Sequence, residues 1–289
     1  MPIGRPAGKR PGPQPAFFAV EIAGEPVLGI EVALVAAGVL CWVGALVRGS
    51  VHRWWSAPQQ LPPWPISGSD FALFVLLFLS LYSLAPIAVA RVLGQDLSDL
   101  DPGEMLVQGY ATQASILAAW ALFRLHPAAE TPRGRTGLAA AVGTGLTAFL
   151  FLIPALMATI GGWYWLLEVA GLDPQPQDVI EIIQAAPPSE RLYWVLLAVV
   201  VAPVCEELVF RGYVFRFLHQ RMPLLPAAII SGAVFASAHF NLLTFLPLLL
   251  LGAVLGILYA KTGRLAASIA LHMVFNLNTV IVVLLGGAA

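Results

Sequence analysis

The sequence predicts an all-α, polytopic integral membrane protein of about eight transmembrane helices around a buried polar active-site chamber. Of its 289 residues, 59% are hydrophobic and only 11% are charged, whereas a soluble domain carries about 25% charged residues. The apolar residues gather into runs near the ~20 residues that a helix needs to cross a bilayer. Charged side chains interrupt one of these runs, although each costs about 2.5–3.5 kcal/mol at the centre of a membrane helix.

The apolar runs give the order of the predicted helices. A Pro- and Gly-rich stretch, residues 1–26, comes first, and we expect it to form a disordered or loosely bound tail. Residues 27–289 show no internal repeat and are expected to form a single integral membrane domain. The predicted spans are Val27–Val47, Phe71–Leu93, Leu106–Leu125, Gly137–Ile160, Leu192–Phe215, Ala227–Leu243, Leu246–Ala260 and Leu265–Leu285.

Charge and cysteine content restrict the classes of function and partner. A net charge of −1 offers no basic surface for nucleic acid. Cys41 and Cys205 lie inside apolar runs, so we expect neither a disulfide framework nor a thiolate metal site. The expected partners are the lipid bilayer and a membrane-associated protein or peptide. Lys and Arg are more frequent in alternate loops, which favours a cytoplasmic location for the loop with Arg216 and Arg221. In a bacterial host, the membrane would be the inner membrane.

The interrupted run is the stretch from Arg191 to Arg221. It leads directly into Glu206 and Glu207, and Arg211 follows one helical turn after Glu207. Glu207 and Arg211 are neighbours on a helix face and are expected to form an ion pair. Glu206 is rotated by about 100° from Glu207 and has no local partner. We expect one carboxylate to do chemistry and the other to be structural; the alternative is that both satisfy Arg211 and nearby backbone groups.

Two further predicted helices carry polar groups in apolar surroundings. Phe235 and His239 lie four residues apart among small residues, and His272 and Asn276 lie four apart in the last span. A buried histidine is more often a satisfied core group, and an amide is often a clamp between helices. The functional alternative is that the amide fixes the imidazole tautomer or donates to an oxyanion. A rise of ~1.5 Å per residue puts Glu206, His239 and His272 within about 8 Å of one depth, which predicts one chamber open to the cytoplasm.

One carboxylate, two imidazoles and an amide inside a membrane suit the activation of water. A glutamate in an apolar pocket can act as a general base, and histidines can stabilise a tetrahedral intermediate. Alternatively, His239, His272 and either Glu206 or Glu207 would supply the ligands of a Zn²⁺ ion that activates the water. The H-E-x-x-H motif and a serine nucleophile elbow are absent. The residues therefore leave open a glutamate protease without a cofactor and a zinc-dependent one.

Two other classes of function fit the same residues. A non-catalytic membrane binder or self-immunity factor would keep the polar chamber as structure. A proton-coupled transporter would use Glu and His side chains to relay protons. The transporter is less favoured, because the sequence shows no paired halves with helices broken in corresponding positions.

Three motifs resemble those of the CAAX protease and bacteriocin-processing family of intramembrane proteases, which includes the type II CAAX prenyl endopeptidases. E-E-x-x-x-R at Glu206, Glu207 and Arg211 is similar to the first family motif. F-x-x-x-H at Phe235–His239 and H-x-x-x-N at His272–Asn276 are similar to the second and third. Each motif alone is weak, but the three occur in the family's order and spacing, over roughly residues 190–280.

The resemblance implies an eight-helix intramembrane endopeptidase with either a glutamate or a metal-dependent mechanism. Its substrate would be membrane-associated, either a prenylated CAAX protein or a transmembrane segment. Glu206 would activate the water with His239 opposite it, and His272 and Asn276 would form the oxyanion-stabilising side. The supporting residues that the resemblance implies are Glu207, Arg211 and Phe235.

Overall fold

The computed structural model describes residues 25–64, 66–126, 136–172, 182–184 and 186–286, and every regular element within them is helical. The predicted all-α class is therefore confirmed, while the expected tail lies outside the described residues except for its last two. The elements are α2 (Glu25–Val47), α3 (Ser50–Ser56), α4 (Gly68–Leu93), α5 (Pro102–Phe123), α6 (Leu138–Val169), α8 (Pro188–Leu196), η3 (Leu197–Val201), α9 (Ala202–Val209), η4 (Phe210–Phe215), α10 (Arg216–His219), α11 (Leu224–Ser237), α12 (Leu242–Thr262) and α13 (Leu265–Gly286).

Six of the described helices are long and apolar enough to cross a membrane. One of them is a continuous run of 32 residues, Pro188–His219, formed by α8, η3, α9, η4 and α10. The other two predicted spans correspond to α5, which carries Glu104, Gln108 and Gln113, and to α11, which has only 14 residues. Each of the eight predicted segments thus contains a helix, and the molecule is a multi-pass membrane protein by length and composition.

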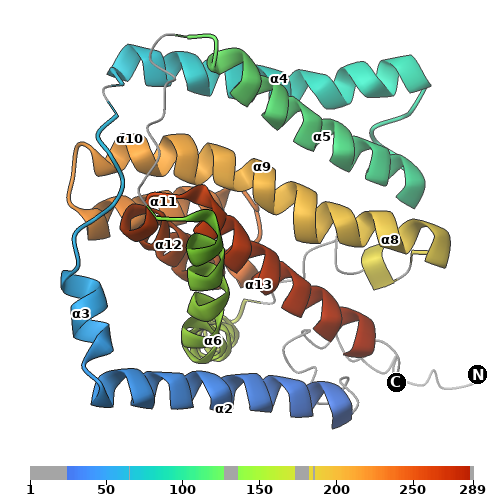
Figure 1. Cartoon of the computed structure of the whole chain (residues 1–289). Helices are drawn as coiled ribbons and strands as arrows, with labels where there is room; N and C mark the ends of the chain where they lie inside the picture. The colour runs from blue at the N-terminus through green and yellow to red at the C-terminus, as the bar shows by residue number, and fades with distance from the viewer. Residues whose placement is uncertain (1–24, 65, 127–135, 173–181, 185, 287–289) are drawn as a thin grey trace, which may run out of the picture.

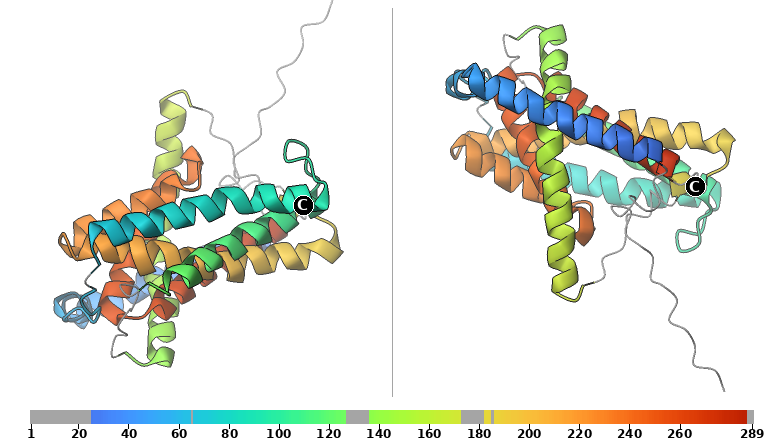
Figure 2. Two further views of the ribbon diagram at one scale, coloured as in Figure 1. Left: turned by 90° about the horizontal axis from the view of Figure 1, so that it is seen from above. Right: turned by 90° about the horizontal axis from the view of Figure 1, so that it is seen from below.

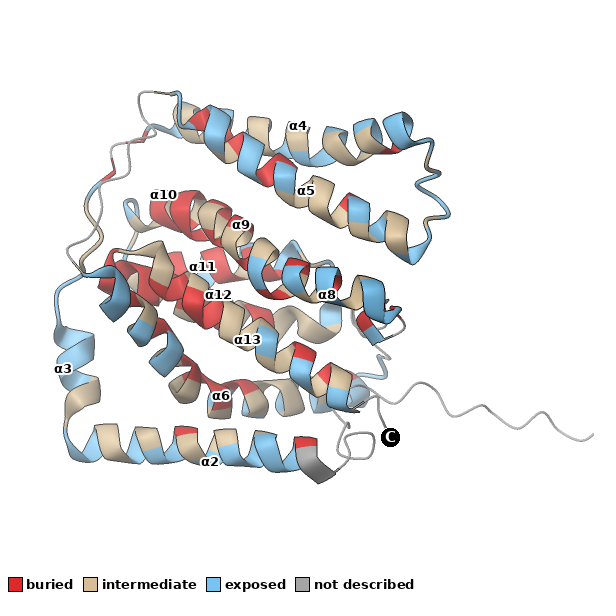
Figure 3. Cartoon of the chain, turned by 45° about the vertical axis from the view of Figure 1, so that its right-hand side comes forward, coloured by how far each residue is buried: buried red, intermediate tan, exposed pale blue. Residues whose placement is uncertain are grey.

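The helices that carry the three motifs form the centre of the molecule. The run α8–α10 lies beside α13, with α11 and α12 behind, while α4–α5 and α2 lie on opposite sides of this group (Figure 1). Helix α6 runs across α2 at a steep angle and also packs on α12 and α13 (Figure 2). Half of the residues in the most apolar stretch of α12 are buried, namely 50%, whereas only 6% are buried in the corresponding stretches of α2 and α4. Figure 3 shows the same contrast between the centre and these outer helices. The apolar faces of α2 and α4 are therefore the ones left for lipid.

Helices α11 and α12 approach closely at a pair of glycines. A Cβ atom on Gly232 would lie 2.6 Å from the carbonyl oxygen of Leu249 and 2.8 Å from the amide nitrogen of Ala253. A Cβ atom on Gly252 would lie 2.7 Å from the Cα atom of Gly232. Small residues allow this kind of backbone contact between membrane helices. The crossing brings the backbone of Gly252 within reach of the motif-bearing helix.

The segment between α3 and α4 is tied to the end of the motif-bearing run. The buried guanidinium of Arg216 donates from Nη2 to the carbonyl oxygen of Pro62 at 3.0 Å and lies over the Trp64 ring, 5.4 Å from its centroid. One turn later, Nη2 of Arg221 donates to the carbonyl oxygen of Ile66 at 2.8 Å. These two cations satisfy carbonyl groups in a segment whose described residues form no regular helix.

The predicted boundary between the sixth and seventh spans lies several residues too late in the chain. Helix α11 ends at Ser237 instead of Leu243, and α12 already begins at Leu242. The side chain of Asn241 accepts a hydrogen bond from the backbone N–H of Thr244 at 3.0 Å, and so caps the start of α12. Phe240, with a φ of 48°, reverses the chain between the two helices. His239 therefore lies in a turn just after α11 and not within a helix.

Candidate active site

The two glutamates lie in a short α-helical segment between two π-helical ones. Helix α9 carries Glu206 and Glu207, η3 precedes it and η4, with Arg211, follows it. π-helical turns are rare and occur frequently at functional sites. They also rotate the helix locally, so that the direction of each side chain differs from that in a regular α-helix.

Glu207 and Arg211 form the predicted ion pair, and both side chains are fully buried. Nη1 of Arg211 donates to Oε1 of Glu207 at 2.8 Å, and Nη2 donates to the carbonyl oxygen of Gly252 at 3.2 Å. The guanidinium also lies 4.5 Å from the centroid of the Phe235 ring. Arg211 therefore joins its own helix to α11 and α12. Burial of such a charge pair is costly unless hydrogen bonds replace the lost hydration, and the bonds to Gly252 and His272 do so in part.

His272 contacts both glutamates. Its Nδ1 lies 2.9 Å from Oε1 of Glu207, which as a carboxylate accepts the hydrogen bond, so the ring carries a proton on Nδ1. Its Nε2 lies 3.7 Å from Oε2 of Glu206. The side chain of Glu206 is 19% exposed, whereas that of Glu207 is 0% exposed. The structure therefore separates a buried, neutralised carboxylate from a more accessible one beside an imidazole.

His239 joins this group through Phe235. Its Nδ1 lies 2.8 Å from the carbonyl oxygen of Phe235, and because a carbonyl only accepts, this nitrogen carries a proton and Nε2 is the ring nitrogen left for another partner. In the neutral form of the ring, Nε2 has the free lone pair. The Phe235 ring packs edge-on against the rings of both His239 and His272, at centroid distances of 4.8 and 5.5 Å. Phe235 therefore lies in contact with both imidazole rings.

Asn276 has a different neighbour from the one expected. Its Nδ2 donates to the carbonyl oxygen of Ala198, in η3, at 2.7 Å. The partner that fixes the His272 tautomer is Glu207. Sequence reasoning missed this contact with Ala198, although a proline in the apolar run, Pro203, was an available signal of irregular backbone.

The side chains that would bind zinc in the metal-dependent alternative are not gathered into one ligand set. Nδ1 of His239 and Nδ1 of His272 are both committed to oxygen acceptors, which leaves one free ring nitrogen on each. Within the described part of the chain, no three His, Cys, Asp or Glu side chains are close enough together to hold a metal ion. The arrangement of His239, His272 and Glu206 therefore does not fit a three-ligand metal site.

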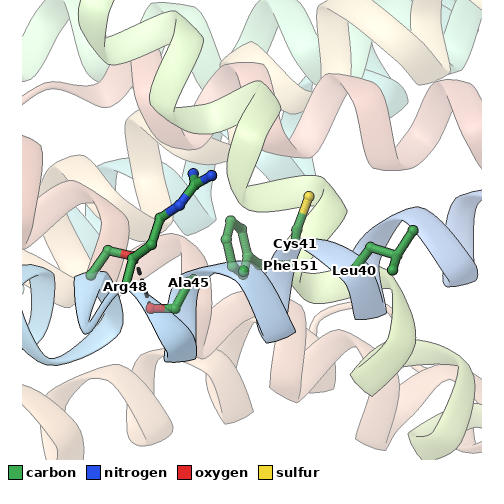
Figure 4. A pocket seen from close by; sticks show the side chains of 7 residues that line it. Leu40, Cys41, Ala45, Arg48 and Phe151 are labelled. Carbon is green, nitrogen blue, oxygen red and sulfur yellow. Dashed lines mark hydrogen bonds between the residues drawn. The ribbon is translucent and has the colours of Figure 1, made fainter.

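A cavity of about 450 Å³ lies between α2 and α6, away from these residues (Figure 4). Its lining includes Leu40, Cys41, Arg48 and Phe151, and none of the three motifs contributes to it. The candidate site is therefore defined by the contacts of the motif residues and not by this cavity.

Comparisons with known proteins point to the same part of the chain. Residues 188–278 match the family described as type II CAAX prenyl endopeptidase Rce1-like. The chain is also 27% identical over 118 residues to a Bacillus subtilis (strain 168) protein named "Putative membrane peptidase YdiL". That match covers 41% of this chain and 46% of the relative, or about half of the relative's length. No solved structure matches.

The family match spans α8 to α13 and contains all the motif residues that meet in the structure. The two carboxylates, the buried arginine and both histidines come from three separated stretches of this segment. Residues 188–278 are therefore similar to the Rce1-like, type II CAAX prenyl endopeptidase family, which is the resemblance that the three motifs predicted.

Proposed function

We propose that this protein is an intramembrane endopeptidase in which Glu206 activates a water molecule. The observation that carries the proposal is the division between the two carboxylates. Glu207 is held by Arg211 and His272, whereas Glu206 is more exposed and lies 3.7 Å from Nε2 of His272. A base must reach its water and change protonation state during the reaction, and of the two only Glu206 is placed to do so.

In the proposed reaction, Glu206 accepts a proton from water as the water oxygen attacks the carbonyl carbon of the scissile peptide bond. The attack forms a tetrahedral intermediate with a negative oxygen. The proton then passes to the leaving nitrogen, the C–N bond breaks, and a carboxylic acid and an amine are released. One carboxylate can thus serve as base and then as acid, without a covalent intermediate.

The histidines have distinct parts in this scheme. The free Nε2 of His239 accepts a hydrogen bond from the attacking water and helps to orient it. His272 faces Glu206 through Nε2, and when this atom is protonated it stabilises negative charge on Glu206 or on the oxyanion. Glu207 holds the ring of His272 in this orientation, as a carboxylate orients the histidine of other hydrolases.

The substrate that we propose is a membrane-associated protein or peptide, either one with a prenylated CAAX terminus or one with a transmembrane segment. The family match and the apolar surroundings of the site support this class. The excess of Lys and Arg on one side supports a site that opens to the cytoplasm. The aqueous side then supplies water, and the bilayer supplies the substrate.

The test is hydrolysis by the purified full chain in lipid nanodiscs. The probes are a farnesylated CAAX peptide, its unmodified twin and a transmembrane peptide, and the new termini are identified by mass spectrometry. We expect Glu206→Gln to abolish cleavage while the protein unfolds at an unchanged temperature. Glu168→Gln, on the exposed end of α6, is the matched control and should cleave as the wild type does.

The other two classes of function give different outcomes. A non-catalytic binder or self-immunity factor would retain the peptides uncleaved, and Glu206→Gln would leave binding intact. A proton-coupled transporter would acidify or alkalise proteoliposomes in a manner that depends on Glu206, again without new peptide termini. Either result would overturn the proposal.

A further inference from the structure

The motif-bearing helix contains a proline where a backbone hydrogen bond should be. Pro203 stands at the start of α9, three residues before Glu206, inside a continuous helical run. Proline has no N–H, so it leaves one carbonyl group of the preceding turn without its donor. An unsatisfied carbonyl in apolar surroundings is destabilising, so this carbonyl needs a hydrogen-bond donor from elsewhere in the structure.

The π-helical segment η3 determines which carbonyl loses its donor. The N–H of Ala202 donates to the carbonyl oxygen of Leu197, five residues earlier, which is the π-helical pattern. In the same pattern the carbonyl oxygen of Ala198 would face the nitrogen of Pro203. That nitrogen carries no hydrogen, so Ala198 is the group that needs a donor from elsewhere.

Asn276 supplies this donor. Its Nδ2 lies 2.7 Å from the carbonyl oxygen of Ala198, well within hydrogen-bond range. The side chain comes from α13, one helical turn after His272. The amide thus replaces, from a neighbouring helix, the N–H that Pro203 lacks.

Two hydrogen bonds then join the same pair of helices on either side of Glu206. Asn276 holds Ala198, eight residues before Glu206, and His272 holds Glu207, the residue after it. Together these two bonds fix the position of the motif-bearing run along α13 and its rotation about its own axis. They therefore set how the carboxylate of Glu206 faces Nε2 of His272. Loss of the Asn276 bond removes the link before Glu206 and leaves the bond between His272 and Glu207, which lies after it.

We infer that Asn276 is a positioning residue, which substitutes for the missing N–H of Pro203 and so sets the geometry between Glu206 and His272. This inference rests on the proposed function for its effect on catalysis, but the hydrogen bond itself does not. It differs from the oxyanion-stabilising role that the family resemblance implies. The two roles separate experimentally because only the positioning role depends on residue 203.

The experiment is a double-mutant cycle with Asn276→Leu and Pro203→Ala in the full chain in nanodiscs. An alanine at position 203 restores a backbone N–H for the preceding turn, so the amide of Asn276 is no longer needed there. We expect Asn276→Leu to lower kcat by about 10–100-fold with little change in KM, because a displacement near 1 Å suffices for such a loss. In the Pro203→Ala background, Asn276→Leu should lower kcat much less, so the double variant should be nearly as active as the single Pro203→Ala variant.

The same cycle is measured by unfolding in an inactive Glu206→Gln background. There we expect Asn276→Leu to destabilise the protein less when Pro203→Ala is present, which is a coupling that distant, independent residues do not show. Thr279→Val, on the next turn of α13 with its hydroxyl bonded to its own helix, is the matched control for a polar-to-apolar change. It should couple with Pro203→Ala in neither measurement.

Three outcomes would overturn the inference. Additive unfolding effects would show that Asn276 does not replace the N–H of Pro203. Coupled unfolding without recovery of kcat would show that Asn276 acts directly on the reacting groups. Coupled unfolding with an unchanged kcat for Asn276→Leu would show a purely structural bond. If the wild type cleaves no peptide, the proposed function fails, and with it the catalytic half of the inference; the unfolding cycle still decides whether the bond exists.

Discussion

Nδ1 of His272 and Oε1 of Glu207 lie 2.9 Å apart, and the same oxygen accepts a hydrogen bond from Arg211. One carboxylate oxygen therefore serves a cation and an imidazole at once, in a place closed to solvent. The adjacent carboxylate of Glu206 faces the other nitrogen of the same imidazole, at 3.7 Å.

Glu207→Gln should destabilise the protein by about 3–5 kcal/mol, because it leaves the buried guanidinium of Arg211 without its counter-charge. The measurement is thermal or denaturant unfolding in nanodiscs, with the exposed Glu168→Gln as the control for loss of one carboxylate. The double variant Glu207→Gln and Arg211→Met should regain a large part of this loss, since it removes both charges. Equal stability of Glu207→Gln and wild type would contradict the assignment of a structural ion pair.

Arg211→Lys should be destabilising even though it keeps the charge. An ammonium group can replace one hydrogen bond, but it cannot reach Glu207 and Gly252 together or lie flat over Phe235 as the guanidinium does. We expect a loss of about 1.5–3 kcal/mol from the charge-assisted hydrogen bond to the Gly252 carbonyl, visible as a lower unfolding temperature. Arg91→Lys, on the exposed end of α4, should show no such loss.

Gly232→Ala should separate α11 from α12. The new methyl group would meet backbone atoms of Leu249 and Ala253 at less than 3 Å, and backbone cannot move aside as a flexible side chain can. The shift would also strain the bond from Arg211 to Gly252, so both stability and peptide cleavage should fall. Gly143→Ala is the matched control: its Cβ meets nothing within 4 Å in a helix, and it should be neutral or stabilise by up to about 1 kcal/mol.

Removal of divalent metal should leave cleavage unchanged. Among the described residues, no group of three His, Cys, Asp or Glu side chains is placed to hold an ion, and Glu206 can activate water as a base without one. The measurement is the cleavage rate after prolonged dialysis against a chelator, with metal content determined by mass spectrometry. A rate that disappears on dialysis and returns with Zn²⁺ would contradict the glutamate mechanism and favour the zinc-dependent alternative.

Much of the architecture was predictable because the bilayer imposes a strong rule. Long apolar runs must be helical to satisfy their backbone, so the eight predicted segments all contain helices. The pairing of Glu207 with Arg211 followed from helical spacing alone, as did the more independent position of Glu206. Conversely, the end of α11 was placed too late, since apolar composition continues through a turn that Phe240 and the Asn241 cap create.

The relations between helices were not predictable from spacing. That His272 bonds Glu207, and that Asn276 bonds Ala198, depends on how α13 crosses the motif-bearing run. The rotation of that run depends in turn on η3 and η4, and helical periodicity assumes a regular α-helix throughout. Pro203 indicated an irregularity, but only the packed structure reveals which carbonyl it affects and which side chain compensates.

The turn that holds His239 has a consequence for how a peptide chain could enter. Glu206 and His272 stand on helices of the central group, and moving either would break several buried contacts. His239 stands on a link of a few residues between two helices, where its ring bonds to the Phe235 carbonyl and packs on the Phe235 ring. Of the three groups, His239 is therefore the one whose displacement would disturb no helix, and we expect a peptide substrate to enter the site beside this turn.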